Sequence, residues 1–421
     1  MKLNQNPTDS STASSLTING ARLWHNLMEM AAIGATDKGG SSRLALSAED
    51  SEGRRKLIAD CQLLGMSVTS DAIGNLFCRL EGTHPEFDPV VMGSHLDTQP
   101  KGGRFDGVYG VLAALEVIRT LHDAGLQPKR SIEIAVWTNE EGARFTPAMM
   151  GSAVFAGIMP LEDALARLDA SGISVAASLE KERWAGDSPL GRAFNAYFEA
   201  HIEQGPVLEE RDLVIGVVTG GQAISWLDVT VTGNSAHAGT TPMQNRTDAF
   251  LAVASMAAAL EEVAKSFAPE GLLTIGELTI SSASRNTIPG NVVFTVDLRH
   301  PDDAVLAQFD QACRQSLASV AKRRGVQVSV KQHWLSAATP FDESCVALVN
   351  EAATASGYTH QRMISGAGHD AIHIAKHCPT TMIFIPCAGG ISHNEAESIE
   401  PEHAEKGANV LFKAVTARAD M

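Results

Sequence analysis

Apolar and polar positions along the first third of the chain follow two periods, one typical of helices and one of strands. The predicted elements, in order, are a helix over 22–34, a helix over 48–65, a strand over 66–80 broken by Gly74, a strand over 89–93 that ends at His95, a helix over 108–121 and a strand over 131–137. Because strand, helix and strand alternate here, the pattern predicts a parallel α/β sheet.

Residues 214–331 have a different hydrophobic pattern, in which apolar and polar side chains alternate strictly along the predicted strands. The predicted elements are strands over 226–232, 292–299 and 326–330, and helices over 247–265 and 304–323. We expect an α+β domain with a four-stranded antiparallel sheet that leaves one face open. After this segment, a helix over 344–356 and a buried strand over 379–386 are predicted, with the hydrophobic pattern of the first third of the chain.

The resulting prediction is a two-domain α/β protein, as the length of 421 residues also suggests. The first domain, residues 1–213 plus 332–421, is expected to hold a mixed, mainly parallel sheet with helices on both faces. The second, residues 214–331, is inserted into it.

Composition narrows the class of protein. The formal net charge of −16 argues against nucleic acid as a partner, because phosphate binding needs a basic face. The six cysteines are scattered singly, as in proteins of reducing compartments. The polar stretch Lys2–Ser15 lacks a signal-peptide core, and no apolar run approaches the ~20 residues that span a bilayer. We therefore expect a cytoplasmic protein without a membrane partner.

The most informative polar residues are Glu140 and Glu141, which directly follow the apolar strand over 131–137. Carboxylates near a buried strand are costly unless something uses them. Neighbouring side chains in extended backbone point to opposite sides, so one carboxylate can bind a metal while the other faces water. In parallel α/β sheets the ligand site lies beyond the carboxyl ends of the strands, which is where this pair is expected.

Other candidate ligands occupy similar places. His95 and Asp97 share a side of an extended segment, and Asp97 is placed to accept the second ring N–H of His95; a surface turn is the alternative. Asp106 lies among glycines before a helix, where a helix N-cap is equally common. His201 lies among acidic residues, and His393 comes after the apolar strand that ends at 386; a lone histidine after a strand is more often structural than a ligand. Together, these signals predict a metal-dependent hydrolase.

Seven segments then show a resemblance to a known family, and they occur in that family's order. They are Gly93–Thr98, Gly102–Gly107, Asn139–Phe145, His201–Gly205, Ser235–Pro242, Val296–Pro301 and Gly366–Asp370. The chain resembles the amidohydrolase branch of the M20 metallopeptidases, which contains N-carbamoyl-L-amino acid hydrolases, β-ureidopropionases and allantoate amidohydrolases. The resemblance implies a catalytic domain, an inserted lid or dimerisation domain, and a homodimer.

The resemblance also implies a centre of two divalent metal ions per subunit. Asp106 would bridge the ions, His95 and His201 would complete one site, and Glu141 and His393 the other. Glu140 would be the general base, and Asp97 would support His95. A set of imidazoles and carboxylates suits zinc, with manganese, cobalt or nickel as alternatives.

Five residues are implied to bind the substrate: Gln204, His237, Asn286, Arg299 and Gly368. The planar fork of Arg299 matches a carboxylate, although an arginine on a surface strand has other uses. The resemblance implies that His237 reaches the active site of the other subunit and stabilises the developing oxyanion.

The expected reaction is cleavage of the carbamoyl C–N bond of an N-carbamoyl-L-amino acid or carbamoyl-β-alanine, giving amino acid, ammonia and carbon dioxide. Allantoate is the alternative substrate, and residues 221–226 lack the arginine that many members carry after the glycine. A catalytically dead or peptide-binding relative is a third hypothesis, against which the intact ligand set argues.

Two further patterns are set aside. His369, His373 and His377 recur every four residues, which could place a metal-binding stripe on one helical face. No acidic pattern beyond Asp370 accompanies them, and the resemblance places Gly366–Asp370 at the edge of the substrate site. Glu203 is expected to support the site without binding metal.

Overall fold

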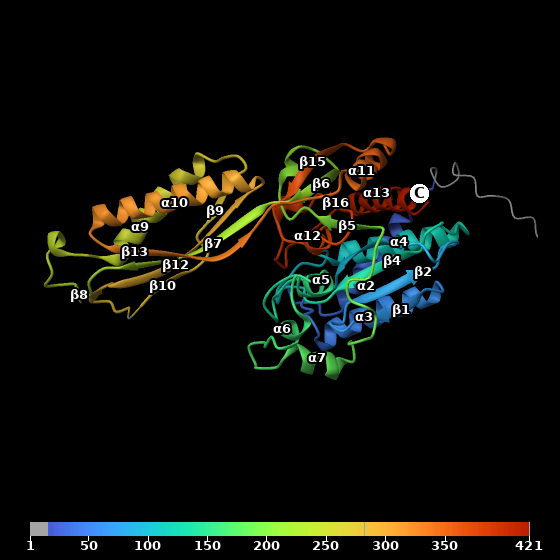
Figure 1. Cartoon of the computed structure of the whole chain (residues 1–421), viewed down its shortest axis with the longest axis horizontal. Coiled ribbons are helices and arrows are strands. Elements are labelled where there is room, and N and C mark those ends of the chain that lie inside the picture. Colours follow the sequence, from blue (N-terminus) through green and yellow to red (C-terminus); the bar gives the residue numbers. More distant parts are fainter. Residues whose placement is uncertain (1–15, 282, 421) are drawn as a thin grey trace, which may run out of the picture. The chain divides into compact units, whose positions relative to one another are not determined.

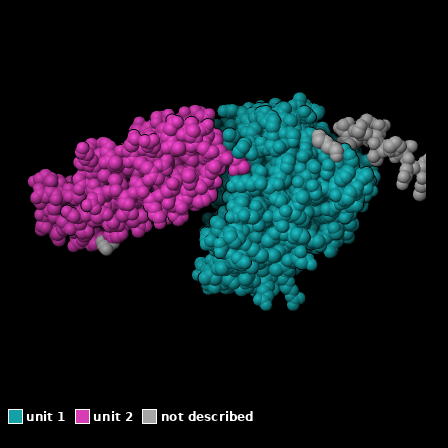
Figure 2. Space-filling model, in the orientation of Figure 1, with its two compact units in different colours: residues 1–220, 340–421 teal, residues 221–339 magenta. Residues whose placement is uncertain are grey.

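The computed structural model describes residues 16–281 and 283–420, so the polar stretch Lys2–Ser15 lies outside the described residues. The chain forms two compact units, shown in Figure 2. Unit 1 contains the described residues up to 220 and from 340 onward, and unit 2 contains residues 221–339. In the sequence, unit 2 is therefore inserted between the two segments that form unit 1.

Unit 1 is built on a nine-stranded sheet with the order β1-β2-β4-β3-β5-β16-β6-β14, and β15 also pairs with β6. Its strands are β1 (Ser67–Ser70), β2 (Leu76–Leu80), β3 (Val90–His95), β4 (Ile132–Trp137), β5 (Ala196–Ile202), β6 (Ile215–Gly221), β14 (Thr339–Pro340), β15 (His360–Ser365) and β16 (Thr380–Ile385). Every position of β3, β4, β5 and β16 is buried, so both faces of the sheet centre are covered.

The sheet is less parallel than the sequence suggested. The central strands β4, β3, β5 and β16 run parallel, but β1, β2 and β4 are joined by antiparallel pairs, and β6 is antiparallel to β16. The sheet is mixed, as expected, but antiparallel pairs flank its four parallel central strands. The reason is local: only the strands joined through helical crossovers run parallel, whereas β1 and β2 are joined by a short turn.

Helices cover the sheet. They are α2 (Gly20–Ala32), α3 (Ala48–Leu63), α4 (Val108–Asp123), α5 (Met150–Phe155), α6 (Leu161–Leu165), α7 (Val175–Glu182), α8 (Val207–Glu210), α11 (Glu343–Ala355), α12 (Asp370–Ile374) and α13 (Pro401–Ala419), with a 3-10 turn η2 (Ala388–Gly390). Helices α2, α4, α11 and α13 pack on one another in a layer, and α4 and α13 contact the central strands. Helices α5 and α12 form a second contacting pair, visible in Figure 1.

Unit 2 has an antiparallel sheet of five strands, in the order β10-β12-β7-β13 with β9 also on β12. Its elements are β7 (Ala223–Thr232), β8 (Ala236–His237), η1 (Met243–Asn245), α9 (Ala249–Lys265), β9 (Leu272–Thr274), β10 (Leu278–Ile280), β11 (Thr287–Ile288), β12 (Asn291–His300), α10 (Asp303–Arg324) and β13 (Gln327–Ser336). The sheet is four strands wide, as expected, but two short strands, β9 and β10, pair with the same edge of β12 one after the other.

Alternation along the strands of unit 2 decides which face is covered. Leu227, Val229 and Val231 of β7 are buried, and α9 and α10 pack against this sheet and each other. Trp226, on the other face, is 39% exposed, as is Trp334 of β13. The prediction of one open sheet face is therefore confirmed for this unit.

The unit boundaries differ from the expected 214 and 331. Strand β6 pairs with β16 and belongs to the sheet of unit 1, and β13 continues along β7 as far as Ser336. Both junctions therefore lie seven or eight residues later, at 221 and 339. Hydrophobic pattern alone does not reveal which sheet a strand joins. Among the described residues, no helix is both long and apolar enough to cross a bilayer.

Candidate metal centre

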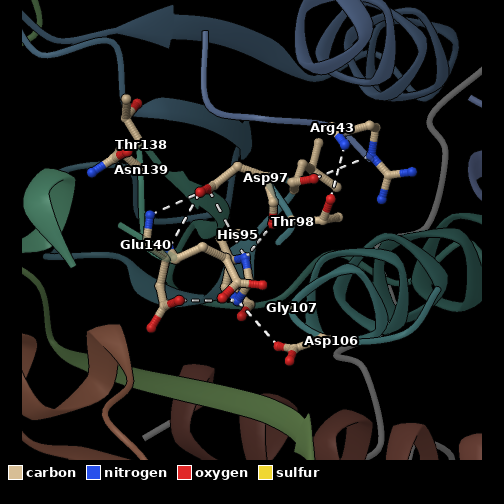
Figure 3. Close-up of polar contacts among 12 residues, drawn as sticks. Arg43, His95, Asp97, Thr98, Asp106, Gly107, Thr138, Asn139 and Glu140 are labelled. Atoms are coloured by element: carbon tan, nitrogen blue, oxygen red, sulfur yellow. Dashed lines mark hydrogen bonds and ion pairs between the residues drawn. The ribbon is translucent and has the colours of Figure 1, made fainter. Parts of the chain in front are cut away.

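The candidate ligands lie where the central strands of unit 1 end. His95 is the last residue of β3 and pairs with Trp137, the last residue of β4. His201 is the last but one residue of β5. Asp106 lies in the turn between β3 and α4, and Figure 3 shows it beside His95 and Glu140.

Asp106 is the residue that the histidines share. Its Oδ1 atom lies 3.5 Å from His95 Nε2 and 3.2 Å from His201 Nε2. Its Oδ2 atom lies 3.5 Å from His393 Nε2, and that nitrogen is 3.3 Å from Glu141 Oε2. Two possible metal-holding triads therefore meet at one carboxylate: His95, Asp106 and His201, and Asp106, Glu141 and His393.

The donor atoms are spaced as a cation requires. In a tetrahedral site with bonds of about 2.0–2.1 Å, neighbouring donors lie about 3.3 Å apart. The separations of 3.2–3.5 Å around Asp106 match that spacing. The imidazole and carboxylate donors also suit zinc and its first-row neighbours. The residues present therefore fit two divalent ions, one per triad.

Hydrogen bonds fix the two buried imidazoles for this task. His95 Nδ1 donates to the Asp97 carbonyl oxygen at 2.8 Å, and His201 Nδ1 donates to the Ile202 carbonyl oxygen at 2.9 Å. These bonds place a proton on Nδ1 of each ring, so Nε2 is the nitrogen that faces Asp106 and would supply the lone pair for a metal ion.

Asp97 supports the site differently from the expectation. Its carboxylate is 4.0 Å from His95 Nδ1, while its backbone carbonyl accepts the ring N–H. The carboxylate instead accepts the backbone N–H groups of Glu140 and Glu141, each at 3.2 Å. Asp97 therefore fixes the backbone of the glutamate pair, and its side chain is turned away because those donors hold it.

The glutamate pair also lies differently from the expectation. Strand β4 ends at Trp137, and Asn139 then turns the chain with a φ of 57°, a left-handed conformation that asparagine tolerates. The two carboxylates nevertheless diverge. Glu140 Oε2 lies 3.5 Å from His95 Nε2, whereas Glu141 contacts His393. The turn, and not strand alternation, separates their directions.

Burial dominates the electrostatics of these carboxyl groups. It raises the pKa of Glu140 well above its usual value, with repulsion from Asp370 and Glu141 adding to the effect. Burial and nearby Asp106 raise the pKa of Glu141 to about 8. Burial also acts to raise the pKa of Asp106, but hydrogen bonds from His201 and His95 lower it well below the usual value. Divalent cations would favour the charged forms of all three.

Two of the expected substrate-binding residues, Gln204 and Gly368, belong to unit 1. Gln204 Nε2 donates to Asp106 Oδ2 at 2.8 Å, and its carboxamide oxygen is buried without a hydrogen bond among the described residues. That oxygen is an available acceptor beside the candidate ligands. Gly368 lies in the loop before α12, where its Cα is packed against the Met149 side chain.

The three expected substrate residues of unit 2 fall into two groups. His237 and Asn286 are neighbours, because Ala238 N donates to the Asn286 carbonyl oxygen at 2.8 Å and β8 pairs with β11. Both side chains are exposed. Arg299, on β12, pairs with Ile224 at the start of β7, and its guanidinium contacts Asp297 at 2.8 Å.

These groups lie at opposite ends of unit 2. The β8–β11 pair lies beyond Asn291, the first residue of β12, and Gly233 N donates to Gly290 O at 2.8 Å there. Arg299 lies eight residues further along β12, which corresponds to about 27 Å at ~3.4 Å per strand residue (Figure 1). One small substrate cannot contact His237 and Arg299 of the same chain.

Sequence reasoning missed several contacts in the centre. Gln99 donates from its backbone and its side chain to the Glu141 carboxylate, at 3.1 and 2.7 Å. His369 packs edge-on against His201, and with Glu199 these residues form a further group of possible ligands. Gln99 directly follows the Gly93–Thr98 segment, and this position in the sequence could have identified it as a residue of the centre.

The helical histidine stripe does not exist as such. Helix α12 spans only Asp370–Ile374, so His369 caps it and His377 lies beyond it. His373 instead contacts Ser152 Oγ at 3.2 Å, and His377 contacts the Arg192 carbonyl oxygen at 2.9 Å. Glu203, the other residue set aside, accepts two backbone N–H groups of α8.

Comparison with known proteins decides the family. Residues 91–417 match the family model described as peptidase family M20/M25/M40. The chain belongs to this family. It is therefore a hydrolase, and M20 enzymes are metal-dependent, in agreement with the triads around Asp106.

Individual M20 relatives narrow the comparison. The chain is 47% identical to an N-carbamoyl-L-amino-acid amidohydrolase of Rhizobium meliloti, covering 96% of this chain and 97% of the relative. It is 57% identical to a hydantoinase/carbamoylase family amidase of Burkholderia ambifaria, whose crystal structure superposes with a TM-score of 0.91 over 96% of this chain and 98% of that one. It is also 32% identical to an allantoate amidohydrolase of Bacillus subtilis, over 91% of this chain and 93% of the relative.

Proposed function

We propose that this protein is a binuclear metal-dependent amidohydrolase that cleaves the carbamoyl C–N bond of an N-carbamoyl-L-amino acid or carbamoyl-β-alanine. The observation that carries the proposal is the single carboxylate of Asp106, whose two oxygens serve two separate triads. The name of the relative from Rhizobium meliloti supports the substrate class.

His95, Asp106 and His201 would hold one ion, and Asp106, Glu141 and His393 the other. When bound, two divalent ions polarise the scissile carbonyl and lower the pKa of the attacking water. Zinc suits the donor set best, with manganese, cobalt or nickel as alternatives.

Glu140 is the proposed proton carrier. Its carboxylate is buried beside His95, and Asp97 fixes its backbone, so it is held at the centre without belonging to either triad. Glu140 accepts a proton from the attacking water and returns it to the amine as the C–N bond breaks. The products are the free amino acid and carbamate, and carbamate then breaks down to ammonia and carbon dioxide.

Substrate recognition is assigned to groups of complementary chemistry. The orphaned oxygen of Gln204 can accept a ureido N–H, and Gly368, next to the Met149 side chain, would border the substrate. The Arg299 guanidinium matches the substrate carboxylate. His237 and Asn286 would come from the partner subunit of a homodimer formed through unit 2, because they lie too far from Arg299 within one chain.

An ammonia-release screen tests the substrate assignment. Protein reconstituted with each metal would be offered N-carbamoyl-L-amino acids, carbamoyl-β-alanine and allantoate. We expect the highest kcat/KM for a carbamoyl amino acid, and loss of activity on chelation. A higher value for allantoate would favour the alternative that the relative from Bacillus subtilis suggests. Absence of chelator-sensitive hydrolysis with every substrate would contradict the proposal.

A further inference from the structure

Glu397 is a buried carboxylate for which the proposed reaction has no use. It lies four residues after His393 and is 1% exposed. Its Oε1 atom accepts the backbone N–H groups of Phe105 and Asp106, at 2.9 and 3.1 Å. A side chain that follows β16 therefore holds the backbone of the turn between β3 and α4, nearly 300 residues earlier in the sequence.

The other carboxylate oxygen of Glu397 reaches the Asp106 side chain through Ser392. Ser392 Oγ lies 3.2 Å from Glu397 Oε2 and 2.9 Å from Asp106 Oδ2. A hydroxyl has one proton, so Ser392 donates to one of the two carboxylates at a time and lies between them. Gln204 Nε2 adds a bond to Ser392 Oγ at 3.2 Å.

The turn that carries Asp106 is shaped around Glu397. A Cβ atom on Gly103 would lie only 1.9–2.2 Å from the Glu397 carboxyl atoms, so any larger residue there would displace this carboxylate. The glycines of this turn are thus explained in part by contact with Glu397. The C-terminal segment folds back to deliver it, because Glu397 N donates to the Asn394 carbonyl oxygen at 3.0 Å.

His393 needs such an attachment. It lies outside the regular elements, its side chain is 53% exposed and its backbone has a φ of 54°. Ser392, its direct neighbour, is the described side chain that joins this segment to both Asp106 and Glu397. Without these bonds, nothing in the β-sheet fixes the distance between His393 and Asp106.

We infer that Glu397 is a positioning residue that, with Ser392, holds the Asp106 turn and the His393 segment together so that the second triad is formed. This inference rests on the proposed metal centre. Glu397 belongs to neither triad; it would act through the backbone of Asp106 and through Ser392.

The test compares Glu397→Ala and Glu397→Gln with a matched control, Glu203→Ala. Glu203 is also buried and also accepts two backbone N–H groups, both at 2.8 Å, but these belong to α8. Glutamine keeps an oxygen acceptor for Phe105 and Asp106. The first readout is Co²⁺ binding by competition with a chromophoric chelator, together with the visible spectrum of the bound Co²⁺.

We expect Glu397→Ala to weaken binding of one Co²⁺ ion by about 10–100-fold and to change the spectrum, as loss of a group that orients ligands does. Glu397→Gln, which keeps both the volume of the side chain and an oxygen acceptor, should stay within about threefold of wild type. Unchanged Co²⁺ affinity in Glu397→Ala, or an equal loss in Glu203→Ala, would overturn the inference.

A second readout does not depend on metal. In ion-free protein, hydrogen exchange at the amides of 103–107 should accelerate at least tenfold in Glu397→Ala but not in Glu203→Ala. If wild type binds two ions but hydrogen exchange in Glu397→Ala is unchanged, the role of Glu397 is refuted and the proposed metal centre stands. If wild type binds no ions, the proposed metal centre is refuted as well. Should Glu397→Ala not fold, Ser392→Ala takes its place and is expected to weaken one Co²⁺ ion while sparing the other.

Discussion

At the scale of single residues, the proposed centre assigns different roles to its carboxylates: Asp106 and Glu141 would hold cations, and Glu140 would move protons. Asp106 belongs to both triads, whereas Glu140 belongs to neither and yet lies 3.5 Å from His95. Substitution of each by its isosteric amide distinguishes these roles, because an amide keeps the shape of the side chain and removes its charge and basicity.

The first prediction concerns Glu140→Gln. This variant should bind the same amount of metal as wild type, measured by elemental analysis, while kcat falls by ~10²–10⁴ because the general base is lost. Asp106→Asn is the matched comparison, and it should lose metal as well as activity. Near wild-type turnover in Glu140→Gln would show that another group carries the proton.

A second prediction concerns the stability of the fold in acid and His373, a residue outside both triads. Burial lowers the pKa of His373 to about 4, below the ~6.5 expected for an unfolded chain. Between these values the unfolded state binds more protons than the native state, so stability falls as pH falls from 6.5 toward 4. We expect His373→Gln to lose about 1–2 kcal/mol less than wild type between pH 7 and pH 5.

Urea unfolding at both pH values measures this difference. His25→Gln is the control, since that histidine is on the surface and 71% exposed. If wild type and His373→Gln lose the same stability between the two pH values, protonation of His373 does not contribute to acid unfolding.

At the scale of elements, the turn between β3 and α4 is the most constrained part of the centre. Gly107 has a φ of 67°, and a Cβ atom there would lie 2.3 Å from ring atoms of His95. Gly125, just after α4, has a φ of 63° but no atom within 4 Å of an added Cβ. Both glycines therefore have a left-handed backbone conformation, but only at Gly107 would an added Cβ atom collide with another residue.

The third prediction uses this pair. Gly107→Ala should displace His95 and lower metal affinity at least tenfold, in addition to a cost of roughly 1 kcal/mol for the left-handed backbone. Gly125→Ala should show only the backbone cost, measured by thermal unfolding, with metal binding intact. Equal metal affinity in both variants would mean that His95 can move aside without consequence.

The elements were predictable where periodicity was strong. Helices such as α10 and buried strands such as β16 fall within two residues of the expected bounds. Strand β5 was not predicted, because the buried Glu199 interrupts its apolar run and finds its partners, Ser94 and Tyr197, only in the folded sheet. Strand direction was missed for the same reason: pairing depends on contacts distant in sequence.

The site itself was predictable as a set of residue types at strand ends, and the structure brings His95, Asp106, Glu141, His201 and His393 together. Their supporting bonds were not predictable. The Asp97 carboxylate turns to the backbone of Glu140 because the turn at Asn139 places two N–H groups there. Such a bond depends on backbone geometry that no motif records.

At the scale of the whole molecule, the separation of His237 from Arg299 within unit 2 has consequences for assembly. A substrate that needs both residues must sit between two subunits, each supplying one of them. The exposed Trp226 and Trp334 on the open sheet face add apolar area to a unit already proposed to form the dimer.

The fourth prediction is that inactive variants complement each other. After subunit exchange, Glu140→Ala mixed with His237→Ala should recover about one quarter of wild-type activity, since half of the dimers carry one intact site at statistical exchange. Glu140→Ala mixed with Gln204→Ala should recover nothing, because both residues serve the site of their own chain. No recovery in the first mixture, with exchange demonstrated, would place His237 in its own subunit's site or outside any site.

In the proposed two-ion centre, the two oxygens of Asp106 would couple the binding of one ion to the binding of the other. The first ion to bind would orient this carboxylate, which is already charged. The second ion would meet it already aligned but would also have to approach a neighbouring positive charge. Whichever contribution is larger, each ion must change the affinity for the other by the same factor. A titration that measures this factor from one triad therefore gives it for the other, and mixed-metal forms of the enzyme should obey the same equality.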